Sequence, residues 1–129
     1  MNNLAIGLVA EVNLTVTEAD TAAKLGSGLV PVFGTPALVA LMESAAVKAL
    51  DGHLDAGQTT VGGRIDVRHL AATPVGMKVR ARAELTAIDG RKLIFQIEAW
   101  DESEKIGEAS HERFVVDMEK FIARAQGKK

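Results

Sequence analysis

The chain has 129 residues, of which 47% are hydrophobic and 25% charged, and its formal net charge is −2. This length fits one globular domain, which we expect residues 1–129 to form. The small net charge argues against a nucleic-acid-binding protein. The absence of cysteine excludes disulfides, thiolate nucleophiles and thiolate metal ligands. The N-terminal apolar run lacks a basic leader and a cleavage site, and no segment approaches the roughly 20 apolar residues of a membrane span. We therefore expect a cytoplasmic protein without a membrane partner.

The residues that precede the first long apolar segment predict a strand followed by a short helix. Polar and apolar residues alternate from Val12 to Thr17, which indicates the strand. Residues 17–20 are typical of a helix start, and the short helix is expected to end near Gly26 or Gly28. A glycine-rich loop then leads to the next element.

Segment 36–50, PALVALMESAAVKAL, predicts a long helix that is apolar on almost every side. Thr35 suits the N-cap and Pro36 suits the first helical position, while Asp51-Gly52 marks the end. A helix with this pattern is normally buried on most sides. We therefore expect it at the centre of the fold.

Glu43 is the residue of this helix that points most clearly to chemistry. It is the only charged residue between Lys24 and Lys48, and an acid in apolar surroundings is unfavourable unless a partner compensates for it. A carboxylate held there could act as a general base or as a nucleophile. It could instead pair with an arginine or lysine, and the sequence leaves both interpretations open.

Four strands are predicted after the helix, because the hydrophobic pattern changes to a period of two. They cover residues 61–69, 77–85, 93–99 and 106–116. Consecutive strands with short connections form antiparallel sheets, so we expect an α+β fold in which the sheet wraps around the central helix. Residues 118–125 predict a short terminal helix.

His69 and Thr35 are further candidates for chemistry. The period of two places His69 on the inward face at the end of its strand, where an imidazole could donate to a carbonyl oxygen or protonate a leaving group. It could equally be a core histidine bonded to a backbone carbonyl. Thr35 stands beside the free N–H groups of a helix start, which could support an oxyanion, or it could serve only as a cap.

Two other patterns carry weaker signals. Gly62-Gly63 inside a strand indicates a bulge or a place where a ligand comes close to the backbone. Charges on strands are usually solvated, so His111-Glu112-Arg113 is expected on a solvated face. No metal motif, phosphate loop or dinucleotide fingerprint is present, and we expect neither a metal nor a cofactor.

Three stretches, in this order, resemble the hotdog-fold thioesterases, and specifically the fluoroacetyl-CoA thioesterase-like family: VFGTPALVALMESAAVKAL, GGRIDVRHLAATPVGMKV and IGEASHERFVVDMEKF. The resemblance implies a hotdog fold and hydrolysis of an acyl-CoA or a related thioester. It implies catalytic roles for Thr35, Glu43 and His69. It also implies substrate contacts from a second set of residues, Gly62, Phe33 and Arg113.

One departure from the family bears on specificity. Fluoroacetyl-selective members carry lid phenylalanines upstream of a V-F-x-T segment, where this chain has Leu29 together with Gly26 and Gly28. We therefore expect a general acyl-CoA thioesterase rather than a fluoroacetyl-selective enzyme.

The spacing of Thr35 and Glu43 bears on assembly. They stand eight residues apart on one helix, which separates them by roughly 12 Å along its axis. They can cooperate only if Thr35 meets the Glu43 of another copy, as in an antiparallel pairing of two central helices. The resemblance implies such a homodimer, or a tetramer built from it. Alternative hypotheses are a non-catalytic binder of acyl-CoA or another small apolar ligand, a hydratase or dehydratase, and a structural dimer in which Glu43 forms an ion pair.

Overall fold

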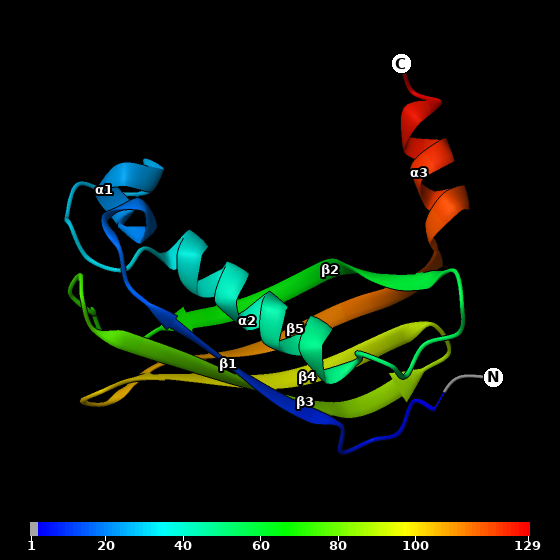
Figure 1. Ribbon diagram of the computed structural model, residues 1–129, viewed down its shortest axis with the longest axis horizontal. Coiled ribbons are helices and arrows are strands. Elements are labelled where there is room, and N and C mark those ends of the chain that lie inside the picture. Colours follow the sequence, from blue (N-terminus) through cyan, green and yellow to red (C-terminus); the bar gives the residue numbers. More distant parts are fainter. Residues whose placement is uncertain (1–2) are drawn as a thin grey trace.

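A five-stranded antiparallel sheet wraps around one long helix in the computed structural model, which describes residues 3–129 (Figure 1). The order of the strands in the sheet is β1-β3-β4-β5-β2. Their bounds are β1 Val9–Thr15, β2 Gln58–His69, β3 Lys78–Asp89, β4 Lys92–Asp101 and β5 Lys105–Asp117. The helices are α1 Ala22–Leu25, α2 Thr35–Ala49 and α3 Met118–Gln126, and a 3₁₀ turn, η1, covers Glu18–Asp20. The α+β arrangement expected from the sequence is confirmed.

Alternation along the central strands builds the inner face of the sheet. Every second residue of β3 and β4 is buried, and this set consists of Val79, Ala81, Ala83, Leu85, Leu93, Phe95, Ile97 and Ala99. Because successive side chains of a strand point to opposite faces, the intervening residues lie on the outer face. The inner face packs against α2, which closes one hydrophobic core.

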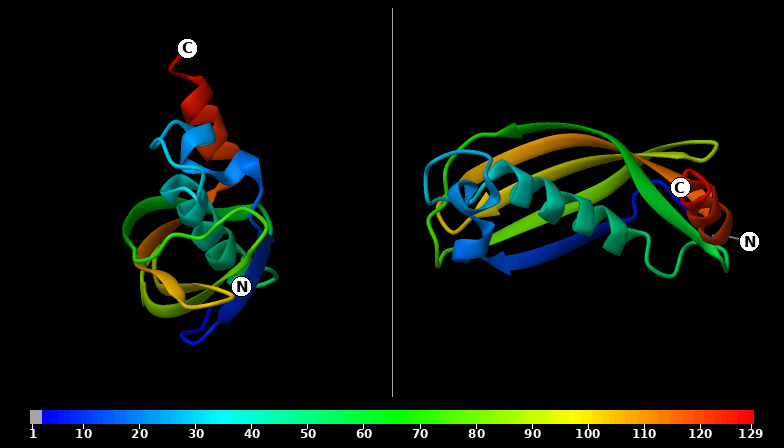
Figure 2. Two further views of the ribbon diagram at one scale, coloured as in Figure 1. Left: turned by 90° about the vertical axis from the view of Figure 1, so that its left-hand side faces the viewer. Right: turned by 90° about the horizontal axis from the view of Figure 1, so that it is seen from above.

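Helix α2 has one buried face and one open face. Leu38, Met42 and Ala45 are fully buried against the sheet, whereas Ala40 and Val47 are exposed. Seen from above, α2 lies in front of the sheet, and no other element covers the side of the helix that faces away from the strands (Figure 2). Helix α1 lies near one end of α2 and α3 near the other. The expectation that the helix is buried on most sides is therefore wrong for the isolated chain.

The start of α2 differs by one residue from the prediction. Gly34 is the N-cap and Thr35 is the first helical residue. Gly34 lies too close to the backbone of Ala22 for a larger side chain, because an added Cβ would stand 3.0 Å from the Ala22 nitrogen. The Thr35 hydroxyl does not cap the helix, since it bonds to a side chain of β2 instead.

The remaining boundaries agree closely with the sequence. The helix α1 ends at Gly26, whose φ of 76° is in the left-handed region that glycine adopts most readily. Strands β1 and β2 begin about three residues earlier than predicted. Helix α3 exposes Met118, Phe121 and Ile122. Within residues 3–129, no helix has the length and apolar character needed to cross a bilayer.

Candidate functional site

The first cluster of candidate residues joins the start of α2 to the end of β2. Thr35 Oγ1 lies 2.8 Å from His69 Nδ1, which is hydrogen-bond distance. The long apolar helix positions the threonine, and the period of two in β2 turns the histidine inward toward it. These two predicted site residues therefore meet within one chain.

The environment of His69 favours the neutral form of its ring. Burial lowers the pKa of His69, and the nearby backbone carbonyl of Ala71 opposes this shift only in part. The Nε2 atom is buried and has no hydrogen-bond partner within residues 3–129. Because buried polar atoms normally have a partner, this nitrogen is suited to a bond with a bound ligand.

A cavity of about 390 Å³ opens beside this pair. Phe33, Thr35 and His69 line it together with the loop after β2. The Phe33 ring stands edge-on to the His69 ring, with centroids 6.4 Å apart, and is itself buried. Phe33 thus supports the imidazole and contributes an apolar wall to the cavity.

The second cluster lies further along α2, where Glu43 meets the inner face of β5. Arg113 Nη1 lies 3.2 Å from Glu43 Oε2 and forms an ion pair with it. Arg113 is 6% exposed, whereas the Glu43 side chain is 39% exposed. The carboxylate is therefore only half covered by its own chain, which corrects the expectation of a fully buried acid.

Arg113 is held on several sides. Its Nε donates to Thr60 Oγ1 at 2.9 Å and its Nη2 donates to the Thr60 carbonyl at 3.1 Å. Burial lowers the pKa of Arg113, and the negative charge of Glu43 opposes that shift. The guanidinium stays charged, as arginine does in proteins, and presents a fixed cation to the carboxylate.

The β2 bulge gives the Glu43 carboxylate its space. The β2–β5 register shifts between Gly62 and Arg64. A Cβ added to Gly62 would stand 2.6 Å from Glu43 Oε2, and one added to Gly63 would collide with the Phe114 ring. The glycine pair is therefore both a bulge and a close approach, as the sequence suggested. A smaller cavity of about 210 Å³ opens here between Glu43, Gly62 and His111.

The candidate residues thus form two separate clusters in one chain. Phe33, Thr35 and His69 lie at the start of α2, and Glu43, Gly62 and Arg113 lie about two helical turns further along. Thr35 and Glu43 are separated by roughly 12 Å of helix, and no bond between them is formed. Each cluster has its own cavity and only part of the predicted chemistry.

Comparisons with known proteins identify the family to which the chain belongs. The family model described as fluoroacetyl-CoA-specific thioesterase, FlK, matches residues 16–119. A curated fluoroacetyl-CoA thioesterase from Streptantibioticus cattleyicolor is 42% identical over 97 residues, which cover 75% of this chain and 70% of the relative. The chain belongs to the fluoroacetyl-CoA-specific thioesterase family.

Solved structures of the same family superpose on nearly the whole chain. A structure of the fluoroacetyl-CoA thioesterase FlK has a TM-score of 0.93 and 34% identity, with 99% of each chain covered. A mutant of that enzyme in complex with fluoroacetate and CoA has a TM-score of 0.86 and 35% identity, covering 92% of this chain and 99% of the other. A Thermus thermophilus thioesterase superfamily member has a TM-score of 0.89 and 29% identity, covering 98% and 93%. The hotdog fold expected from the sequence is confirmed.

The prediction for one segment of β5, His111-Glu112-Arg113, was wrong. His111 and Arg113 are buried on the inner face of β5, at 1% and 6% exposure, whereas Glu112 points away. The expected solvated face is therefore wrong for two of the three residues. The alternation with buried Ala109 and Val115 was the signal that could have placed them.

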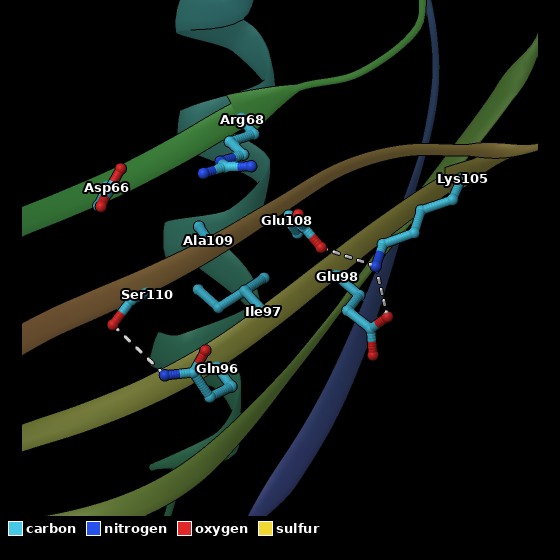
Figure 3. A pocket seen from close by; sticks show the side chains of 9 residues that line it. All are labelled: Asp66, Arg68, Gln96, Ile97, Glu98, Lys105, Glu108, Ala109 and Ser110. Atoms are coloured by element: carbon cyan, nitrogen blue, oxygen red, sulfur yellow. Dashed lines mark hydrogen bonds and ion pairs between the residues drawn. The ribbon is translucent and has the colours of Figure 1, made fainter.

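A third cavity lies on the opposite face of the sheet from α2. It has a volume of about 360 Å³ and is lined mostly by outward residues of β2, β4 and β5. Figure 3 shows this cavity with α2 behind the strands and Lys105 between Glu98 and Glu108. Lys105 Nζ lies 2.9 Å from a carboxylate oxygen of Glu98 and 2.9 Å from one of Glu108. Lys105 is thus paired with two of the acids that line this cavity, and the cavity contains none of the predicted site residues. No group of His, Cys, Asp and Glu among residues 3–129 has a metal-binding arrangement.

Proposed function

We propose that this protein hydrolyses an acyl-CoA or a related thioester at a site shared by two copies of the chain. The observation that carries the proposal is the division of the candidate residues into two incomplete clusters along α2. The Thr35–His69 cluster has a cavity and a nitrogen without a partner. The Glu43–Arg113 cluster has a half-exposed carboxylate and a buried cation. Together they supply a carboxylate that can act as a base or nucleophile and a ring nitrogen that can donate to the carbonyl oxygen, as thioester hydrolysis requires.

A two-fold homodimer with antiparallel α2 helices would unite the clusters. The open face of α2 is apolar at Ala40 and Val47 and leaves Glu43 half exposed. Antiparallel packing of two such faces brings the start of each helix toward the middle of the other, so Thr35 of one copy approaches Glu43 of the second. Two-fold symmetry then creates two equivalent sites, and two dimers could pair further into a tetramer.

The chemistry follows from the groups in each cluster. Glu43 activates a water molecule or attacks the thioester carbonyl carbon itself. In the first route water adds to the carbonyl carbon, the carbon–sulfur bond breaks, and the carboxylic acid and the thiol leave with the two protons of the water. In the second route the carbon–sulfur bond breaks as a mixed anhydride with Glu43 forms, and a water molecule then hydrolyses the anhydride to the carboxylic acid and frees Glu43. His69 Nε2 donates to the carbonyl oxygen when Thr35 donates to Nδ1, which stabilises the developing oxyanion. Pro36 lacks an N–H, so the first turn of α2 supplies fewer backbone donors than usual for that task.

The acyl group is the least specified part of the substrate. The family is named for fluoroacetyl-CoA, but Leu29 at 96% exposure and neighbouring glycines occupy the loop upstream of the cavity. We infer a general acyl-CoA substrate, and a cytoplasmic location would give access to it. The alternative of a non-catalytic acyl-CoA binder makes a different prediction, namely tight binding without turnover.

The test is hydrolysis of an acyl-CoA panel by the wild type and by Glu43→Gln. The substitution keeps the shape and removes the base, so we expect kcat to fall by about 10²- to 10⁴-fold with acyl-CoA still bound. Glu84→Gln is the matched control, because Glu84 is an acid on the outer face of β3, and it should retain wild-type turnover. Wild-type turnover by Glu43→Gln would exclude the proposed role. Binding of acyl-CoA without turnover by the wild type would favour the binder.

A further inference from the structure

His111 is a buried histidine that the proposed reaction does not use, although it lies against the carboxylate cluster. It is 1% exposed and faces α2 from the middle of β5. Its Nε2 lies 3.9 Å from Glu43 Oε2, which is beyond direct hydrogen-bond distance. Buried polar groups need partners, so the partners of its two nitrogens define what the ring can do.

These partners select one neutral tautomer of His111. Nδ1 lies 2.7 Å from the backbone carbonyl oxygen of Arg64, which can only accept, so Nδ1 carries the proton. Nε2 lies 3.2 Å from Arg113 Nη1, and a guanidinium can only donate, so Nε2 is the unprotonated acceptor. A second proton on the ring would set two donors against each other at the Arg113 contact.

Arg113 Nη1 is shared between His111 and Glu43. It lies 3.2 Å from His111 Nε2 and 3.2 Å from Glu43 Oε2. An Nη group carries two N–H bonds in a fixed plane, so the histidine and the carboxylate together orient it. The histidine is in turn held by the backbone carbonyl of Arg64, immediately after the β2 bulge.

We propose that His111 is a positioning residue of the thioesterase site, whose Nε2 lone pair fixes the Arg113 guanidinium that holds the Glu43 carboxylate. The inference rests on the proposed function, which assigns Glu43 its role. His111 acts only through Arg113. Its loss misplaces the carboxylate without removing any group that reacts, and a displacement of about 1 Å at a reacting group can cost up to about 10²-fold in rate.

Two substitutions separate positioning from simple support of the core. His111→Asn places an amide N–H near the Nδ1 position and removes the acceptor at Nε2. His111→Gln places an amide oxygen near the Nε2 position and keeps an acceptor for Arg113. We expect His111→Asn to lower kcat about 10- to 100-fold with KM changed less than threefold, and His111→Gln to recover most of kcat. His53→Asn is the matched control, because His53 lies after α2 outside both clusters and its Nδ1 is 3.2 Å from the Asn3 carbonyl oxygen, and it should leave both constants unchanged.

A double-substitution cycle tests the route through Arg113. If His111 acts through this arginine, then His111→Asn adds little to the loss caused by Arg113→Lys. If the losses multiply instead, the inference is overturned. Equal kcat in the wild type and His111→Asn, or equal losses in the Asn and Gln variants, would also overturn it.

The tautomer can be measured without activity, which keeps this inference distinguishable from the proposed function. Long-range ¹H–¹⁵N correlation spectra of the unsubstituted protein at neutral pH should show His111 protonated at Nδ1 and unprotonated at Nε2. An Nε2–H tautomer or an imidazolium would contradict the inference even if thioester hydrolysis is observed. A third outcome is the predicted tautomer without hydrolysis of any acyl-CoA in the panel. This outcome would reject the proposed function and the positioning role that rests on it. Only the hydrogen bonds assigned to His111 would then stand.

Discussion

Gly62 shows how the absence of a side chain can be a functional property of a residue. Its missing Cβ leaves room for a carboxylate oxygen that an added methyl would approach to 2.6 Å. In Gly62→Ala the long Glu43 side chain can rotate away, so the fold survives while the acid leaves the Arg113 contact. We expect kcat to fall by at least about tenfold with little change in the melting temperature. Parallel thermal melts and acyl-CoA kinetics check this. An unchanged kcat would show that the Glu43 carboxylate does not need the space left by Gly62.

His111 also makes the stability of the protein depend on pH. Burial lowers the pKa of His111 below its ordinary value of 6.5, and its surroundings only partly compensate. The Arg64 carbonyl and Glu43 face the ring and raise the pKa, Glu112 on the other side of β5 also raises it through its charge, and Arg113 lowers it. The folded state therefore binds the proton less tightly than the unfolded state does.

The sign of the effect follows from that difference. Above about pH 6.5 the contribution of neutral His111 to the stability of the folded state is fully present. This contribution is lost as the pH falls toward the lowered pKa that His111 has in the folded state. One such histidine contributes a slope of up to about 1.4 kcal/mol per pH unit in that window. We expect His111→Gln to reduce the slope of the unfolding free energy, measured by urea titration at one fixed protein concentration. His69, whose pKa burial also lowers, should account for part of the slope that remains.

At the scale of elements, the sequence predicted most of the fold because each element carries its own period. The strands alternate and the helix is continuously apolar, and these patterns survive folding because they create the core. Glu43 became a candidate because it is a charged group in an apolar pattern, His69 because the period of two turns it inward, and Thr35 because it stands at a helix start. Their catalytic roles remain predictions. The Thr35 cap was wrong by one residue because a tertiary bond to His69 outcompeted local capping, and no local pattern reports such a bond.

The site was harder to predict where two elements must be brought together. His111 and Arg113 were assigned to a solvated face because charges on strands usually are, although they alternate with buried residues. Their burial depends on Thr60 and Arg64 from β2 and on Glu43 from α2, which supply the hydrogen bonds. These partners lie about 50 to 70 residues away in the chain. The periodicity could have placed the residues inward, but not the network that makes their burial favourable.

At the scale of the whole molecule, the proposal places two halves of a site at different points along the open face of α2. Thr35 and His69 line one cavity, and Glu43, which is paired with Arg113, lines another. If each complete site takes Thr35 from one copy and Glu43 from the other, then the arrangement of two inactivating substitutions between the copies decides the activity. Heterodimers prepared by co-expression with two different tags allow this arrangement to be chosen.

A heterodimer of one Thr35→Ala chain and one Glu43→Gln chain keeps one intact site, because the unsubstituted Thr35 and Glu43 meet across the interface. We expect about half of the wild-type kcat per dimer, since two-fold symmetry gives two equivalent sites. The control places both substitutions in one chain and pairs it with a wild-type chain, which breaks both sites and should abolish turnover. The opposite result, with half activity in the control and none in the first heterodimer, would show that each site is built within a single chain. Because both heterodimers contain the same two substitutions, a general loss of stability cannot produce the expected difference.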